Sequence, residues 1–242
     1  MKKFLPLFLL LCALTAAHAQ NDSRWTIGVK SGVMFGNYKM TDEFLNQYIV
    51  SIGGVPPLGQ PPTSEKSGAN FAVAAYGGYT ILKGLSVQVE FNFFINQNAI
   101  VKWEIPILSN RNGNSSYSSL DIPILLRYSF RDRPSFGVEA GPYLSIPLGK
   151  MKYSLVDGSQ STDPTLEEPV SINLNFGMAI GIFAGFPLGP GRITGNIRYI
   201  FDFLPVKGNI FYDFNTLYPQ FMNTDLFYRR GILMMLGYEY TF

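Results

Sequence analysis

Cysteine and histidine are almost absent from this chain of 242 residues, since each occurs once. The two single copies, Cys12 and His18, lie near the start, so residues 20–242 contain neither. The lack of cysteine excludes a disulfide framework and a thiol nucleophile. The lack of histidine excludes a Ser-His-Asp site, a Cys-His site and an imidazole-bound metal. A carboxylate-only or lysine-based mechanism stays open, but no residue pattern indicates one. We therefore expect a protein without enzymatic activity, cofactor or metal.

The first residues have the pattern of an export signal. Two lysines are followed by the apolar stretch Phe4–Ala17 and by the small-x-small cleavage pattern Ala17-His18-Ala19. We predict that residues 1–19 are a cleaved signal peptide and that residues 20–242 are the mature domain. Without the two lysines, 17 basic residues face 17 acidic ones. A neutral chain gives no reason to expect nucleic-acid binding.

Long hydrophobic runs are missing after residue 20. No apolar stretch there approaches the roughly 18 residues that a membrane-spanning helix needs. Yet the chain contains 20 Phe and 14 Tyr, and its charged residues amount to 15%. Many aromatic residues without a helical span indicate β structure in apolar surroundings.

Eight segments alternate apolar with polar residues, which is the period of a strand with one apolar face. The pattern is clearest over residues 85–96, where Val87 and Val89 alternate with Gln88 and Glu90. Each segment is close to the length that a tilted strand needs to span a bilayer. The predicted strands are residues 25–35, 71–81, 85–96, 119–130, 136–146, 172–182, 193–202 and 228–242.

Short and long connections alternate between these strands. The short ones are residues 82–84, 131–134 and 187–191, and the long ones are residues 36–70, 97–118, 149–169 and 204–227. Outer-membrane barrels have short periplasmic turns and long extracellular loops. An even number of strands then places the first and the last residues of the barrel domain on the periplasmic side.

Alternation alone would also fit a soluble barrel whose apolar face points inward. Gly, Ala, Ser and Asn dominate the polar faces, however, and such small residues suit a narrow lumen. The apolar faces contain residues too bulky to share that lumen, such as Phe91, Phe93 and Tyr128, and the last segment ends on Tyr240 and Phe242. An open sheet edge in lipid would cost several kcal/mol per unpaired backbone group. We therefore predict a closed, antiparallel, eight-stranded transmembrane β-barrel of the bacterial outer membrane, in contact with outer-membrane lipid.

Two prolines fall inside predicted strands. Pro123 and Pro142 each remove a hydrogen-bond donor from the ladder. We expect a β-bulge at each position.

Charged residues on the polar faces are predicted to point into the lumen. Eight strands leave an interior just wide enough for side chains, and mixed charges can pair there. We expect a plug of ion pairs, with a polar pathway or solute site as the alternative. Position relative to the turns predicts the pairs Arg127–Glu139 and Lys30–Glu239. The predicted network comprises Lys30, Glu90, Asp121, Arg127, Glu139, Arg198, Asp202, Arg229 and Glu239.

A protein partner would bind the extracellular loops or the periplasmic turns, because loops on a rigid scaffold commonly mediate recognition. Residues 56–62 are rich in proline and therefore stiff, and we interpret residues 100–105 as an extension of the neighbouring strands. The aromatic residues of 211–221 are expected to fold over the barrel mouth. Asp157 and Asp163 faintly suggest calcium, but their spacing is incomplete.

Two stretches of the chain resemble a known family. They are Leu120-Asp121-Ile122-Pro123-Ile124-Leu125-Leu126-Arg127-Tyr128 and Gly141-Pro142-Tyr143-Leu144. They are similar to the outer membrane β-barrel family of Bacteroidetes that is often labelled PorT-like, and the resemblance extends over essentially the whole mature chain. It implies the barrel, and for one branch of that family it implies protein secretion and gliding motility. We expect a structural or interaction protein, with a secretion or gliding component and a narrow solute channel as alternatives.

Overall fold

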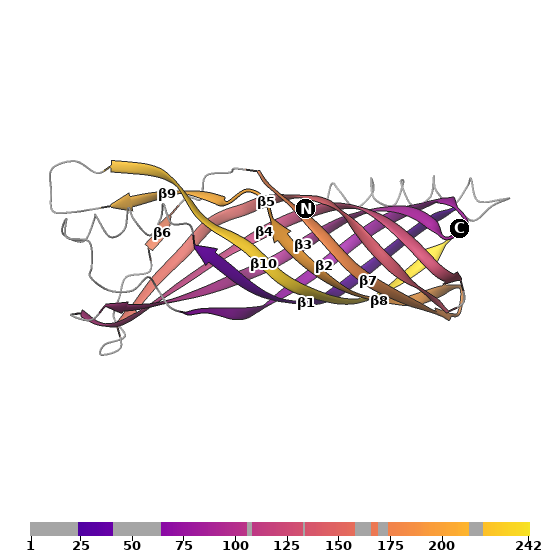
Figure 1. Ribbon diagram of the computed structural model, residues 1–242, viewed down its shortest axis with the longest axis horizontal. Coiled ribbons are helices and arrows are strands. Elements are labelled where there is room, and N and C mark those ends of the chain that lie inside the picture. The colour runs from indigo at the N-terminus through magenta and orange to yellow at the C-terminus, as the bar shows by residue number, and fades with distance from the viewer. Residues whose placement is uncertain are drawn as a thin grey trace, which may run out of the picture.

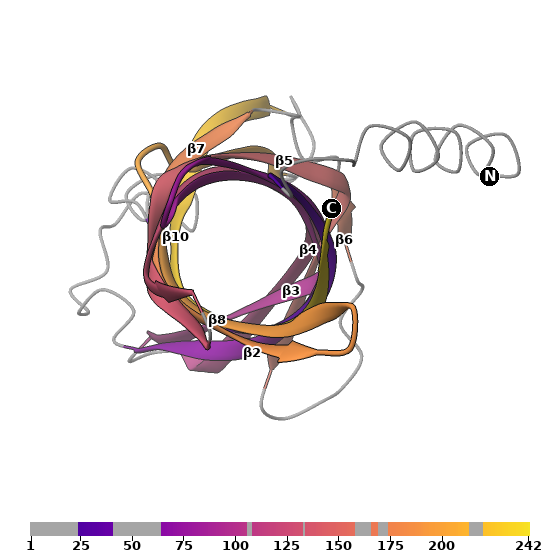
Figure 2. The same ribbon diagram turned by 90° about the vertical axis from the view of Figure 1, so that its right-hand side faces the viewer.

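The computed structural model describes residues 24–40, 64–105, 108–132, 134–157, 166–168, 174–212 and 220–242. These residues form one antiparallel sheet, which curls until its first strand pairs with its last (Figures 1 and 2). The strands are β1 (Trp25–Met40), β2 (Ser64–Leu82), β3 (Leu85–Ile105), β4 (Leu108–Asp132), β5 (Ser135–Asp157), β6 (Leu166–Glu168), β7 (Asn175–Leu188), β8 (Gly191–Asp202), β9 (Val206–Tyr212) and β10 (Gln220–Thr241).

Eight of these strands form the barrel wall, in the order β1-β2-β3-β4-β5-β7-β8-β10. The wall closes because β10 pairs with β1 from Thr26 opposite Thr241 to Met40 opposite Phe227. β6 and β9 are short additions that pair with β5 and with the start of β10, and Figure 1 shows them at the end away from the C-terminus. The predicted closed, antiparallel, eight-stranded barrel is confirmed.

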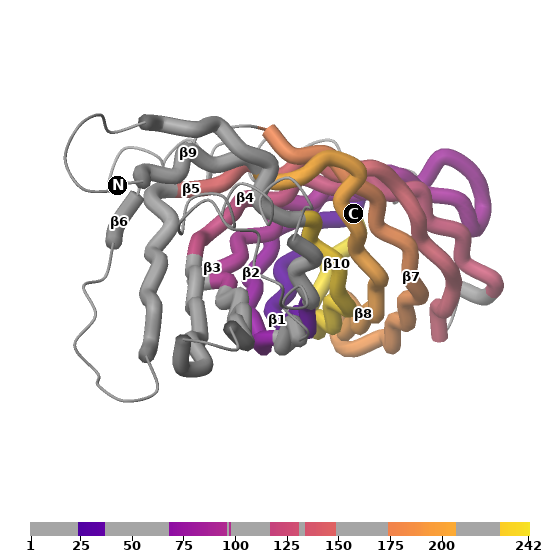
Figure 3. The backbone as a smooth tube through the Cα atoms, turned by 60° about the vertical axis from the view of Figure 1, so that its left-hand side comes forward, coloured from indigo at the N-terminus to yellow at the C-terminus, as the bar shows by residue number. Residues whose placement is uncertain are grey.

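Neighbouring strands of the wall are staggered. Hydrogen-bonded partners can be followed from Trp25 in β1 around every barrel strand and back to Phe35 in β1, ten residues further along. In an eight-stranded barrel, a stagger of this kind accompanies a strand tilt of roughly 35–45° and an interior that side chains can fill. Figure 3 shows the tilted β7, β8 and β10 side by side in the wall.

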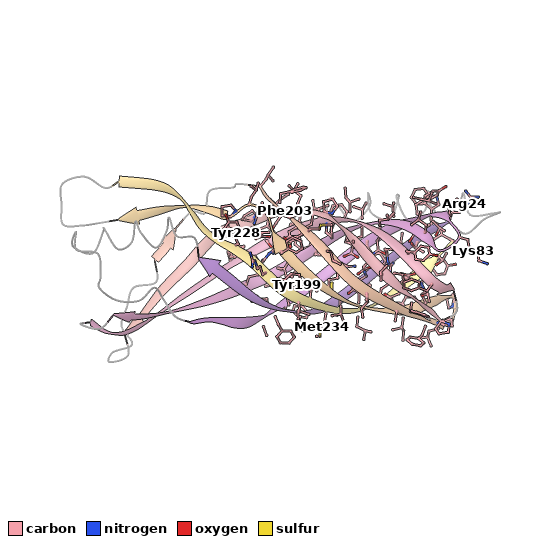
Figure 4. All side chains as sticks on the ribbon, in the orientation of Figure 1. Arg24, Lys83, Tyr199, Phe203, Tyr228 and Met234 are labelled. Carbon is pink, nitrogen blue, oxygen red and sulfur yellow. The ribbon has the colours of Figure 1, made fainter. Side chains whose placement is uncertain are left out.

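The two faces of the wall differ as the alternation predicts. Along β3, Phe91 and Phe93 are 48% and 44% exposed, whereas Glu90 and Asn92 are 0% and 2% exposed. The other barrel strands repeat this alternation, and Figure 4 shows the labelled Met234 pointing away from the barrel. The prediction that the bulky face points outward is confirmed.

Several strands continue beyond their predicted ends. β3 and β4 stay paired as far as Ile105 opposite Leu108, so residues 97–118, predicted as a long connection, form mostly a ladder. The interpretation of residues 100–105 as a strand extension is confirmed. Residues 109–116 are all polar or glycine, so this part of β4 lacks the apolar alternation by which a strand is recognised.

Other predictions fall on residues outside the described ranges. These are the signal peptide at residues 1–19, the proline-rich residues 56–62 and the calcium signal beyond Asp157, which ends β5. Among the described residues, no helix is long and apolar enough to cross a membrane.

The two prolines cause no β-bulge, contrary to our expectation. The register of β4 is the same on both sides of Pro123, and that of β5 with β7 continues unchanged through Pro142. Within these described strands, the β3–β4 ladder instead omits residues 122–123 and the β4–β5 ladder omits residues 141–142. Each proline lacks an N–H toward only one of its two neighbouring strands. Pro123 therefore stays paired with β5, and Pro142 stays paired with β7.

Two inward-facing glycines of β5 allow β4 to approach closely. A Cβ atom at Gly137 would lie 1.9 Å from the carbonyl oxygen of Tyr128. A Cβ atom at Gly141 would lie 1.9 Å from the carbonyl oxygen of Ile124. These distances are shorter than any non-bonded contact, so a side chain at either position would push the two backbones apart.

The change Gly141→Ala is expected to lower the free energy of unfolding by about 1–3 kcal/mol, as overpacking does. Urea unfolding from lipid vesicles would measure this. Gly77→Ala is the matched control, because its Cβ would meet nothing closer than the Thr26 carbonyl oxygen at 3.9 Å. The control should stay within about 0.5 kcal/mol of the wild type. Equal losses in the two variants would contradict the close approach.

Candidate functional site

The structure places all the predicted network residues inside the barrel. They belong to β1, β3, β4, β5, β8 and β10, and each is at most 5% exposed. Their burial follows from the alternation, because they share a face with the small and polar residues of their strands. They form two groups, which we call the central cluster and the outer cluster. The central cluster contains Lys30, Glu90, Arg127, Glu139, Arg198 and Glu239, and the outer cluster contains Asp121, Asp202 and Arg229.

Glu90 is the hub of the central cluster. Its carboxylate lies 2.7 Å from Lys30 Nζ and accepts hydrogen bonds from Arg198 Nη1 and Nη2, the latter at 2.7 Å. The Gln88 amide donates a further hydrogen bond to the same carboxylate. A buried carboxylate is tolerated only when such partners replace its lost hydration.

The predicted pair Arg127–Glu139 is present in the central cluster. The two residues are direct partners in the β4–β5 ladder, and Arg127 Nε lies 3.1 Å from Glu139 Oε2, although without hydrogen-bond geometry. Glu139 also accepts hydrogen bonds from Arg198 Nε and from Asn196 Nδ2, the latter at 3.2 Å. Arg198 therefore links the carboxylates of Glu90 and Glu139.

The predicted pair Lys30–Glu239 is wrong. Lys30 turns to Glu90, and Glu239 is held instead by Arg192 and by the Tyr76 hydroxyl, which donates to it at 2.9 Å. The Tyr76 ring lies in the space that a side chain at Gly28 would occupy, with Lys30 Nζ 4.2 Å from the ring centre. Tyr76 from β2 thus separates the charges of Lys30 and Glu239. The prediction compared β1 with β10 alone and so did not include this tyrosine.

Arg229 is the hub of the outer cluster. Its Nη2 lies 2.7 Å from Asp121 Oδ2 and 3.7 Å from Asp202 Oδ1. Asp202 also accepts hydrogen bonds from the Arg229 backbone N–H at 2.9 Å, from Asn175 Nδ2 at 2.7 Å and from the Tyr143 hydroxyl. The outer carboxylates are therefore satisfied by side chains from several strands.

Three of these ion pairs cross the whole lumen, and the longest joins Arg127 Nη1 on β4 to Glu239 Oε2 on β10 at 3.9 Å. Arg198 lies on β8 and Glu90 on β3, and these strands are four places apart in the ring of eight. Arg229 on β10 and Asp121 on β4 are likewise four places apart. Strands with this separation lie on opposite walls, so each arginine bridges the diameter of the barrel.

The lumen is less uniformly polar than the sequence suggested. Met34, Phe94, Ile200 and Leu233 are among the buried apolar residues of the interior, each at most 4% exposed. No ion pair between described residues joins the two clusters. The alternation assigns these residues to the inner face. Because they are apolar, however, they were not predicted to fill the lumen.

Arg192 is an interior charge that the sequence analysis missed. It pairs with Glu239 and also donates from Nη1 to the Ser135 hydroxyl at 3.3 Å. The predicted strand begins at residue 193, two residues after the start of β8, and so leaves out Arg192, which shares a face with Thr194. With Arg192, the described interior has five cationic and five anionic side chains. Among the described residues, no three His, Cys, Asp or Glu side chains gather as metal ligands.

A family model described as an outer membrane protein beta-barrel domain matches residues 18–206. The chain belongs to this family. It is therefore a small β-barrel protein of the bacterial outer membrane, and the exposed apolar face of the barrel contacts lipid.

Solved structures similar to this outer-membrane barrel share little of its sequence. OprG from Pseudomonas aeruginosa is 12% identical with a TM-score of 0.49, over 92% of this chain and 98% of its own. The neisserial surface protein NspA is 11% identical with a TM-score of 0.43, over 91% and 98%. The outer membrane protease OmpT from Escherichia coli is 9% identical with a TM-score of 0.41, over 93% and 99%. No curated protein matches the chain in sequence.

The change Glu90→Gln is expected to lower the free energy of unfolding by about 3–5 kcal/mol, because it leaves Lys30 and Arg198 buried without their shared carboxylate. Unfolding in urea from lipid vesicles, followed by tryptophan fluorescence, would measure the loss. Lys83→Gln is the control, since Lys83 is exposed at the end of the barrel (Figure 4). It should change stability by no more than about 0.5 kcal/mol. A Glu90→Gln barrel as stable as this control would refute the role of Glu90 as a hub.

Proposed function

We propose that this protein is a non-enzymatic barrel with a plugged lumen, which acts at the two membrane surfaces as a structural or interaction protein. The observation that supports this most is the set of arginines that cross the lumen, most closely Arg198 to Glu90 and Arg229 to Asp121. In a lumen of eight strands, side chains joined across the diameter leave little room for a solute.

The bonding of these charges also favours a plug over a pathway. A solute path needs polar groups that can exchange partners with a passing molecule. Here Glu90 has three side-chain partners, and Asp202 has contacts from β5, β7 and β10. Groups that are already saturated and buried stabilise one fixed arrangement.

The turn end of the barrel is assigned to the periplasm. It contains the two-residue turns Lys83–Gly84 and Gly189–Pro190, and the first and last barrel residues pair there. Short turns are the periplasmic feature of outer-membrane barrels, and longer segments are the extracellular one. The extended ladder of β3 and β4 would then project outside the cell, as a rigid platform for a protein partner.

The PorT-like resemblance supports a second proposal, a component of a secretion or gliding machine. The residues of that resemblance lie in the wall: Asp121 and Arg127 point inward, and Ile124 and Leu126 point toward lipid. These positions build the barrel, so a machine would have to contact its ends. Crosslinking in native outer membranes would show one defined complex for this role and none for a free-standing barrel.

Planar-bilayer recording tests the plugged lumen directly. The purified barrel is expected to insert without discrete conductance steps, because the arginine bridges occupy the cross-section. Insertion would be verified by the slower migration of the unheated, folded barrel on a gel after recovery from the membrane. A channel-forming porin added to the same bilayer serves as the positive control. Regular single-channel steps from the wild-type barrel would overturn the plug and favour the narrow solute channel.

A further inference from the structure

The turn end of the lumen contains a small cavity, which we call the vestibule. Its volume is about 140 Å³, several times that of one water molecule. Side chains from β2, β3, β4, β5, β7 and β8 surround it, and Figure 2 views the barrel from this end. The lining residues are Thr80, Gly84, Leu85, Ser86, Arg127, Ser129, Ser135, Phe183 and Arg192.

Among the described residues of this lining, both charged side chains are cations. The Arg127 guanidinium lies 3.8 Å from the centre of the Phe183 ring, and its Nε lies 3.1 Å from Glu139 Oε2 without hydrogen-bond geometry. The Arg192 side chain is 30% exposed, whereas every other charged side chain of the central cluster is at most 5% exposed. A ligand that enters from the turn end would therefore meet Arg192 first.

The charge of the central cluster is not balanced within itself. With Arg192 it contains four cations against the carboxylates of Glu90, Glu139 and Glu239. The outer cluster has the opposite excess, but no ion pair of the described residues connects the two. Neither Glu139 nor Glu239 lines the vestibule, so the carboxylates that neutralise its arginines do not face a ligand there.

Hydroxyl groups complete the wall of the vestibule. Thr80 and Ser86 are direct partners in the β2–β3 ladder, and Ser135 Oγ accepts a hydrogen bond from Arg192 Nη1 at 3.3 Å. Two guanidinium groups and the hydroxyls of Thr80 and Ser86, with no carboxylate among the described lining residues, form a setting for an anion with several oxygens.

We propose that the vestibule binds a small oxyanion of the phosphate type from the periplasmic side. Arg192 and Arg127 provide the positive charge, and Thr80 and Ser86 donate hydrogen bonds to its oxygens. The bound anion neutralises the excess charge of the central cluster. The binding itself depends on the fold and not on whether the lumen conducts, and the side of entry rests on the proposed orientation of the turn end.

Isothermal titration of the full-length barrel with inorganic phosphate tests the site. The barrel would be held in a neutral sugar detergent at constant ionic strength, so that screening is equal in every experiment. We expect saturable binding of one phosphate per barrel. Arg192→Gln should weaken it about tenfold or more, as the loss of a charged hydrogen bond does. Lys83→Gln removes a positive charge at the same end but outside the vestibule, and it should bind like the wild type.

A second variant protects the test against misfolding of Arg192→Gln, which leaves Glu239 without its nearest cation. The double change Thr80→Val and Ser86→Ala removes two hydroxyls and no charge, and it should weaken phosphate binding several-fold. A short-chain phosphatidic acid added as a competitor would identify a lipid headgroup as the source if it displaced inorganic phosphate. No saturable binding by the wild type would overturn the site, as would unchanged binding in the double variant.

Discussion

A backbone amide in hydrocarbon can find a hydrogen-bond partner only on another backbone group, so a sheet persists there only when its edges meet. In this protein the two edge strands pair in the long β1–β10 ladder, from Thr26 to Met40 of β1. Closure with eight strands and a stagger of ten residues determines how wide the lumen can be. In a lumen of this width, the inward side chains fill the interior and provide one another with hydrogen-bond and ion-pair partners.

The interior charges are organised by this narrowness. Arg198 and Arg229 are long enough to reach the opposite wall, and each meets a carboxylate there. Burial of such pairs contributes little net stability, because desolvation offsets much of the attraction, whereas the loss of one partner is costly. The pairs therefore serve to fix one packing of the lumen. Apolar residues such as Phe94 and Leu233 are buried in the same interior.

The sequence predicted the parts of the fold that depend on local alternation. Val87 to Phe93 revealed both the strand and its lipid-facing side, because a period of two assigns every residue to a face. The extended β3–β4 ladder was not predictable, since residues 109–116 have no apolar face to alternate. The bulge expected at Pro123 did not occur, because the loss of two ladder pairs leaves the register intact.

The interior contacts were predictable only between adjacent strands. Arg127 and Glu139 flank one short turn, so counting from that turn placed them opposite each other. The contacts of Lys30 depend on Tyr76 and Glu90 from β2 and β3, and the reach of Arg198 across the lumen depends on the stagger of all eight strands. These contacts and the stagger are properties of the closed barrel, so no single segment of the sequence predicts them.

In this barrel the bulky face touches lipid and the charged face is enclosed. Residues 20–242 contain no cysteine, so a spin label can be attached at single introduced cysteines along residues 88–95 of β3 in lipid vesicles. We expect a period of two, in which labels at Val89, Phe91, Phe93 and Ile95 collide readily with dissolved oxygen and labels at the positions between them do not. High accessibility of the bulky positions to a water-soluble nickel complex, or the reverse alternation, would contradict it.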